Sequence, residues 1–151
     1  MLTSATALLL GCGRYFAPDI NLSRFLKESD VIGTWILTSN TLILAKKDGY
    51  VPLPESLHQI TIGSNGVCQF SSIVEFGERV QYVEGDGQWQ INHDTEGRKN
   101  RLQLRISTKN ETRDMSFDFT EEKNTIYLWD FWGDPDSWEF LKYKSKVIHR
   151  K

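Results

Sequence analysis

Two segments of this sequence alternate between apolar and polar residues, and this alternation restricts the chain to folds built from half-buried β-strands. Residues 101–107 read Arg-Leu-Gln-Leu-Arg-Ile-Ser, and residues 114–119 read Asp-Met-Ser-Phe-Asp-Phe. Successive side chains of a strand point to opposite faces, so a period of two is typical of a sheet with one buried face and one wet face. The sequence therefore predicts antiparallel strands over one apolar core.

Short turns separate six further strand-like segments from these two, so the chain reads as a meander. The clearest turn, Gly63-Ser-Asn-Gly66, has residues suited to positive φ. Closing a meander into a barrel removes the exposed edges of an open sheet. We expect an all-β fold: a single small antiparallel up-and-down β-barrel of about eight strands with a short N-terminal helix. The expected strands are residues 31–38, 58–62, 67–73, 85–92, 101–107, 114–119, 125–131 and 138–143.

Two segments outside these strands have helical features. Residues 21–30 predict the short N-terminal helix, with Asn21 as one possible capping residue. Residues 39–48 fit a brief helix that ends at Gly49, but the first strand could equally continue through Leu44. The sequence leaves these two alternatives open.

The N-terminus is an apolar leader that ends Leu-Leu-Gly-Cys12. About ten apolar residues are too few to span a bilayer, which needs roughly twenty. This ending resembles the bacterial lipobox, whose cysteine becomes the lipid-carrying first residue of the mature protein. The resemblance implies a signal segment over residues 1–12, a membrane anchor at Cys12 and a tether over residues 13–20. Gly13, where an Asp would imply inner-membrane retention, implies the outer membrane, facing the periplasm.

No Lys or Arg precedes Arg14, whereas a signal peptide opens with positive charge. Either the charged region lies upstream of Met1, or the segment is an ordinary apolar N-terminus with a chance cysteine.

Two Gly-x-Trp motifs, Gly33-Thr34-Trp35 and Gly87-Gln88-Trp89, stand near the starts of expected strands. With the turn at residues 63–66, they resemble bacterial lipocalin-like lipoprotein domains over residues 31–143. The resemblance implies a barrel domain over residues 21–146, followed by a basic tail at 147–151. It implies a possible small apolar ligand in the barrel interior. The residues expected to line that interior are Trp35, Phe70, Trp89, Leu104, Phe117 and Phe119.

The chain departs from true lipocalins because it lacks a clear central Thr-Asp-Tyr motif and an obvious C-terminal helix. A small barrel of this kind can instead be filled by its own side chains. The sequence leaves open whether the interior holds a ligand or is filled by side chains.

Charge and metal-ligating residues bear on the remaining functional classes. The net charge is −2, with 18 Lys and Arg against 20 Asp and Glu, which gives no basic excess for nucleic acid. The three histidines, His58, His93 and His149, are not spaced as metal ligands. If Cys12 carries lipid, Cys68 remains a lone thiol, typically a small buried side chain. We expect no metal and no cofactor.

The aromatic-rich segment near the C-terminus carries Asp130, Asp134 and Asp136. Carboxylate pairs among aromatic rings are typical of acid–base sites for glycans. However, residues 133–137 read Gly-Asp-Pro-Asp-Ser, which favours a reverse turn. The leading hypothesis is a non-enzymatic envelope lipoprotein that holds a small apolar ligand or docks on an envelope partner. The alternative is a hydrolase of envelope glycan or lipid that uses the three aspartates.

Overall fold

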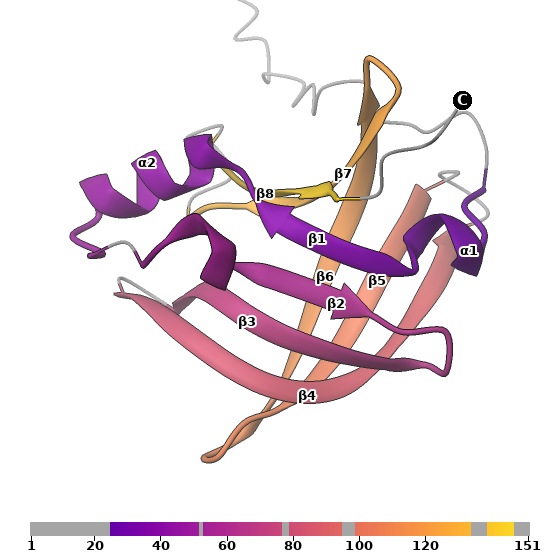
Figure 1. Ribbon diagram of the computed structural model, residues 1–151, viewed down its shortest axis with the longest axis horizontal. Coiled ribbons are helices and arrows are strands. Elements are labelled where there is room, and N and C mark those ends of the chain that lie inside the picture. The colour runs from indigo at the N-terminus through magenta and orange to yellow at the C-terminus, as the bar shows by residue number, and fades with distance from the viewer. Residues whose placement is uncertain (1–24, 52, 77–78, 95–98, 134–138, 147–151) are drawn as a thin grey trace, which may run out of the picture.

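The computed structural model describes residues 25–51, 53–76, 79–94, 99–133 and 139–146 (Figure 1). Over these residues the chain forms an eight-stranded closed antiparallel barrel, in which each strand pairs with the next and β8 pairs with β1. The expected fold class is confirmed. The elements are α1 (Glu28–Val31), β1 (Gly33–Leu37), α2 (Ser39–Lys47), the 3-10 helix η1 (Glu55–Leu57), β2 (Gln59–Ile62), β3 (Val67–Phe76), β4 (Arg79–Asp94), β5 (Lys99–Ser107), β6 (Thr112–Glu122), β7 (Thr125–Phe131) and β8 (Phe140–Ser145).

The two helical segments differ in how far they match the expectation. Helix α1 is shorter than the expected 21–30 and begins only at Glu28, where the Asp30 carboxylate accepts the Lys27 N–H at 2.9 Å. Residues 21–24 lie outside the described residues. The segment after β1 is the helix α2, so the alternative of a longer first strand is wrong.

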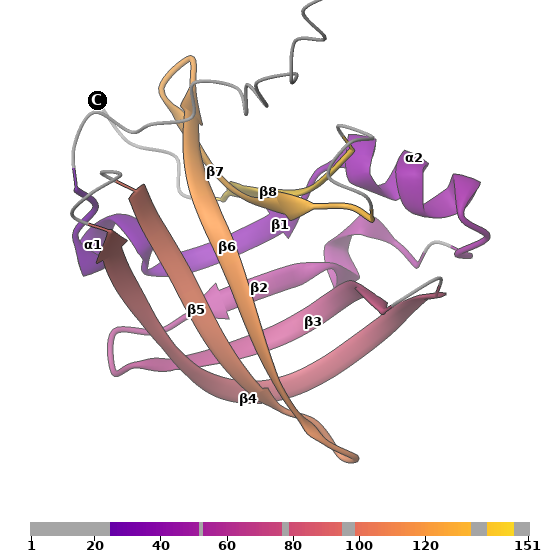
Figure 2. The same ribbon diagram turned by 180° about the vertical axis from the view of Figure 1, so that it is seen from behind.

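Strand β4 begins at Arg79, six positions before the expected start. Its hairpin with β3 pairs Phe76 with Arg79 and continues without a break to Val67 and Gln88. The longer strand curves strongly around the barrel, from the β3 side to the β5 side (Figure 2).

Glycines allow this curvature where β5 crosses β4 closely. A Cβ atom on Gly87 would lie 2.1 Å from the Arg105 carbonyl oxygen, and one on Gly85 would lie 2.4 Å from the Ser107 carbonyl oxygen. No side chain fits at either position unless the backbone moves, which is typical of glycine at a tight barrel corner. The glycine of the second Gly-x-Trp motif is therefore required by strand packing.

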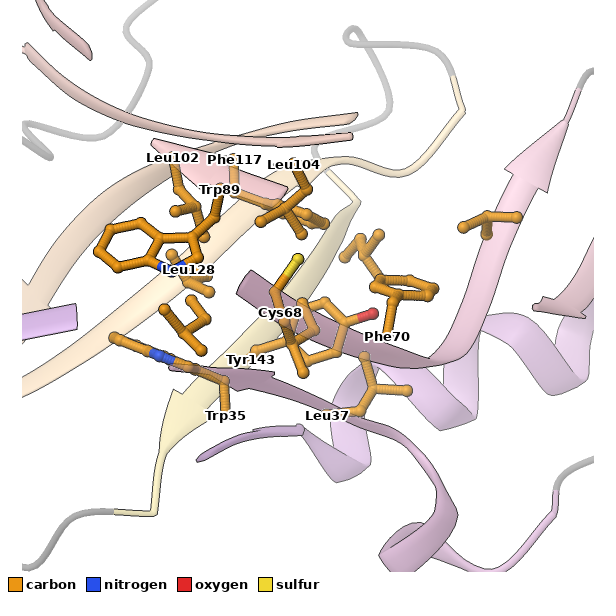
Figure 3. Close-up of a cluster of buried hydrophobic side chains, with 14 of the residues drawn as sticks. Trp35, Leu37, Cys68, Phe70, Trp89, Leu102, Leu104, Phe117, Leu128 and Tyr143 are labelled. Atoms are coloured by element: carbon orange, nitrogen blue, oxygen red, sulfur yellow. The ribbon is translucent and has the colours of Figure 1, made fainter. Parts of the chain in front are cut away.

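The core lies inside the barrel and receives buried side chains from every strand. Figure 3 shows side chains from different strands meeting there, with Trp35 and Trp89 near one side of the view. The interior also holds one polar pair, because the buried Tyr143 hydroxyl donates to Ser72 Oγ at 2.9 Å. The Tyr143 ring lies edge-on to Phe117, with centroids 5.7 Å apart.

The barrel has two different ends, marked by α1 and α2 (Figure 1). Strand β1 starts at the α1 end, where the last residue of β8, Ser145, pairs with Trp35. Both the entry of the described chain and its exit therefore lie at the α1 end. Helix α2 and η1 lie at the opposite end, between β1 and β2 in the sequence.

Candidate functional site

The two motif tryptophans close the α1 end of the barrel. The Trp35 indole N–H donates to the Val31 carbonyl oxygen at 2.8 Å, and the Trp89 indole N–H donates to the Gly63 carbonyl oxygen at 2.8 Å. Trp35 is 1% exposed and packs edge-on against Phe119, with centroids 6.2 Å apart. This end, which we call the floor, is sealed by large rings whose polar atoms have backbone partners.

All six residues expected to line the interior are buried. The structure brings them into one continuous core, and Phe70, Trp89 and Leu104 also border open depressions between strands. Because neighbouring side chains already contact them, their assignment as ligand-contacting residues stays a prediction. The features that point to a binding site lie at the opposite end of the barrel, which carries α2 and η1.

The connection between β1 and β2 is much longer than their pairing requires. The two strands are neighbours, with Ile36 opposite Gln59, so a hairpin turn of roughly two to five residues would suffice. The chain instead uses residues 38–58, about twenty residues, which form α2 and η1 across the barrel end (Figure 1). We call the described part, residues 38–51 and 53–58, the lid. Connecting segments on the surface of a rigid scaffold often carry binding residues.

The lid carries large apolar side chains on both of its surfaces. On its inner side Leu42 and Ala45 are buried and belong to the barrel core. On its outer side, large apolar side chains remain in contact with water, at a density that the rest of the described surface does not match. These exposed lid residues are Ile43 at 59%, Val51 at 81%, Leu53 at 38% and Leu57 at 44%.

Side-chain hydrogen bonds attach one edge of the lid to β8 and to the segment after β7. The buried Thr41 hydroxyl accepts the Lys142 N–H at 3.0 Å and lies 3.2 Å from the Phe140 carbonyl oxygen, to which it donates. The Trp132 indole N–H donates to the Asp48 carboxylate at 2.6 Å.

The other edge of the lid rests on the outer face of β3 and β4. Ser71 Oγ lies 2.9 Å from the Leu57 carbonyl oxygen and 2.5 Å from the Tyr82 hydroxyl. The Tyr82 hydroxyl donates in turn to the Glu84 carboxylate at 2.8 Å. Few main-chain bonds join the lid to the barrel, so its attachment depends largely on individual side chains.

An aromatic cluster of the buried His58 and the half-buried Tyr50 and Tyr82 lies at this second edge. His58 is 0% exposed, and its ring lies edge-on to Tyr50 and Tyr82, with centroids 6.0 and 5.8 Å apart. Both His58 ring nitrogens and the Tyr50 hydroxyl are buried without a hydrogen-bond partner. Burial lowers the pKa of His58 and raises that of Tyr50, and the nearby Leu53 backbone opposes each shift without completing a hydrogen bond.

Only one member of the expected aspartate cluster, Asp130, lies in the described part of the chain. Partial desolvation raises the pKa of Asp130, and the Phe131 N–H, which donates to it at 2.8 Å, acts in the opposite sense. The Asp130 side chain is nevertheless solvent-exposed. Asp134 and Asp136 lie outside the described residues, so the paired-carboxylate hypothesis stays a prediction.

The remaining sequence candidates form no site within the described part of the chain. Cys68 is buried, and burial together with the nearby Asp86 raises the pKa of its thiol to about 11, which disfavours a reactive thiolate. His93 lies 3.0 Å from the Asn100 side-chain oxygen at the floor end. Cys12, His149 and the basic tail lie outside the described residues. No three His, Cys, Asp or Glu side chains among those described are placed to hold a metal ion.

The residues of the lid were not predicted as a site from the sequence. The sequence did contain one signal, because residues 38–58 are far longer than a hairpin turn between two paired strands. The expected meander already makes the first two strands neighbours, so the length of this connection was a signal that the sequence offered.

Comparison with known proteins adds no relative: no protein-family model, curated protein or solved structure matches this chain. Among the residues that the structure describes, no helix is long and apolar enough to cross a bilayer. The fold and the site define the chain as a small closed antiparallel β-barrel with a helical lid.

Proposed function

We propose that this chain is a non-enzymatic, lipocalin-like binding module that holds a small apolar ligand beneath the lid and is anchored to the bacterial envelope through Cys12. The observation that carries the proposal is the long connection between two paired strands. A barrel that needed only stability would join β1 and β2 by a short turn. The lid instead covers the barrel end with apolar residues, as an element that admits a ligand would.

The apolar surfaces of the lid support an apolar ligand in particular. A molecule that enters under Leu42 and Ala45 would exchange one apolar contact for another. Exposed residues such as Ile43 and Val51 would meet such a molecule first. Exposed apolar groups concentrated on one element are typical of an interaction site.

The position of the lid also agrees with the proposed anchor. The described chain enters the barrel at the α1 end, and the lid lies at the opposite end (Figure 1). A chain that is tethered at Cys12 would therefore keep the lid away from the point of attachment. The outer membrane, facing the periplasm, is the expected location.

Two measurements on the purified protein test ligand binding. Native mass spectrometry should show a noncovalent small molecule that is released by organic solvent. Titration with the fluorescent apolar probe N-phenyl-1-naphthylamine should give saturable binding to protein stripped of that molecule. An unliganded mass together with fluorescence that does not saturate would contradict the proposal.

A matched pair of side-chain truncations tests whether the probe binds beneath the lid. Leu42→Ala removes an apolar side chain from the inner surface of the lid, so the affinity for the probe should change. Leu102→Ala removes the same atoms from a buried position opposite Ile91 on β4, near the floor, and should leave the affinity unchanged. Equal effects of the two variants would argue against a site under the lid.

The anchor is tested separately by labelling with palmitate in cells that express the gene with its upstream region. Label should appear in the wild-type protein and be lost in Cys12→Ala. Label that persists in the variant, or a mature protein that begins at Met1, would exclude lipidation at Cys12.

A further inference from the structure

We propose that His58 is an acid-sensitive latch of the lid: its neutral ring holds the lid closed, and its protonation releases the lid from the barrel. The inference deepens the proposed function, because release of the lid would open the proposed ligand site. The latch itself requires only that the lid moves, and it can be tested without any ligand.

His58 stands at the junction between the lid and the barrel. Its N–H donates to the Glu55 carbonyl oxygen in η1 at 3.0 Å, and its carbonyl oxygen accepts the Leu37 N–H of β1 at 3.0 Å. Its ring is held between Tyr50 of the lid and Tyr82 of β4. A change in this ring therefore acts on the contact between the two parts.

The surroundings of the ring disfavour an imidazolium on balance, because burial lowers the pKa of His58 by more than the Leu53 backbone raises it. The titratable side chains that face it are Tyr50 from the lid and Tyr82 from β4. The Glu84 carboxylate accepts the Tyr82 hydroxyl, and η1 contributes the carbonyl oxygen of Glu55 to the backbone of His58. Within the described part of the chain no carboxylate forms an ion pair with His58, so a proton would place an uncompensated charge in a buried site.

The lid is the part that can yield to this charge. Strand ladders fix both walls of the barrel. The lid has no such ladder: Leu42 and Ala45 pack in the core, and hydrogen bonds hold it at Thr38, Thr41, Asp48 and the Leu57 carbonyl oxygen. Moving Tyr50 and the residues before His58 away from Tyr82 would expose the ring to water. The charged ring would then be hydrated while the eight-stranded barrel stays paired.

The direction of the pH effect follows from burial, which lowers the pKa of His58 in the closed form. The open form exposes the ring to water and so has the ordinary pKa of about 6.5. Between these two pKa values the open form binds the proton and the closed form does not. The closed lid is therefore fully stable above about pH 6.5 and loses stability as the pH falls below it.

Hydrogen exchange measured by mass spectrometry on the ligand-free protein tests the latch. After correction for intrinsic rates, exchange of the lid amides should rise by up to about tenfold from pH 7.5 to 5.5, because a group with a pKa near 6.5 is about ten times more protonated than neutral at pH 5.5. Amides of the barrel strands should not change in parallel. Lid exchange that does not depend on pH would overturn the proposal.

Two variants locate the effect. His58→Gln, which cannot take up a proton, should abolish the pH dependence of lid exchange. His93→Gln, a matched change at the floor end, should retain it. A pH dependence that persists in folded His58→Gln would assign the effect to another group and overturn the latch.

If His58→Gln does not fold, NMR titration of the wild-type ring gives the same test. The His58 resonances should stay those of a neutral ring below pH 6.5 and change only together with the lid resonances. A ring that titrates at about pH 6.5 while the lid stays closed would overturn the proposal. Because neither measurement uses a ligand, failure of the latch and failure of ligand binding are distinguishable.

Discussion

The floor and the lid close the same barrel in opposite ways. At the floor, the indole N–H groups of Trp35 and Trp89 each donate to a backbone carbonyl oxygen. At the lid, the Trp132 indole N–H donates to a side chain, that of Asp48, and the ring of His58 has no hydrogen-bond partner. The floor connects strands by short turns, whereas the lid takes residues 38–58.

This difference separates stability from function within one small domain. Satisfied polar groups and large buried rings stabilise the folded state, and the floor has both. Unsatisfied buried groups reduce stability, and exposed apolar side chains concentrated on one element are typical of an interaction site. This contrast supports the proposal that the lid is the binding end of the barrel.

The largest expected effect is at the floor. Trp35→Ala removes a buried ring and the hydrogen bond to Val31, and it should lower the free energy of unfolding by about 3–5 kcal/mol. Equilibrium denaturation measures this loss. Trp132→Ala is the matched variant at the lid end, and it should also accelerate hydrogen exchange of the lid amides. A loss below about 1 kcal/mol for Trp35→Ala would contradict the assignment of the floor.

A smaller effect is expected where β4 and β5 cross. Gly87→Ala would place a Cβ atom 2.1 Å from the Arg105 carbonyl oxygen, so one strand must move. Forced repacking of this kind typically costs about 1–3 kcal/mol. Thermal denaturation of Gly87→Ala, with the exposed Gln88→Ala as control, measures the effect. Equal melting temperatures for the two variants would show that the strands do not approach so closely.

The buried polar pair should contribute less again. Tyr143→Phe removes the hydroxyl that donates to Ser72 and should cost about 1 kcal/mol. The double variant with Ser72→Ala should cost less than the sum of the two single variants, because the bond is lost only once. Strict additivity in the denaturation free energies would show that the two hydroxyls do not interact.

The smallest effect on stability is expected on the outer surface of the lid. Ile43→Ser should change the free energy of unfolding by less than about 0.5 kcal/mol, because the side chain is 59% exposed. It should nevertheless weaken binding of N-phenyl-1-naphthylamine. Val67→Ser alters a similarly exposed residue, 47% exposed, at the floor end and should leave binding unchanged. Equal affinities for both variants would show that the outer surface of the lid is not part of the binding site.

The sequence predicted the strands that have one wet face and one dry face. Residues 101–107 and 114–119 lie within β5 and β6, and the burial of Trp35 and Trp89 is confirmed. In these places a side chain's polarity reports directly which side of the sheet it faces. The closed barrel followed from the number of strands and the short turns between them.

The first half of β4 was missed for a physical reason. Tyr82 lies on the outer face, where its ring packs against His58 at the lid. Its cross-strand partner on β3, Ile73, is 0% exposed. The adjacent Ser72, which faces the other side of the sheet, is also buried. Because the lid covers this part of the outer face, the alternation of wet and dry residues fails there. The site was missed for the same reason, since its residues gather only when distant segments pack together.

The proposed ligand site and the proposed latch both require that the lid opens independently of the barrel. Native-state hydrogen exchange at pH 7.5 tests this most directly, because it measures the opening free energy of each segment in one experiment. The amides of α2 should exchange at least about 100-fold faster than those that join β1 to β2 and β8, after correction for intrinsic rates. Equal protection across α2 and these strands would mean that lid and barrel unfold as one unit, and would contradict the account.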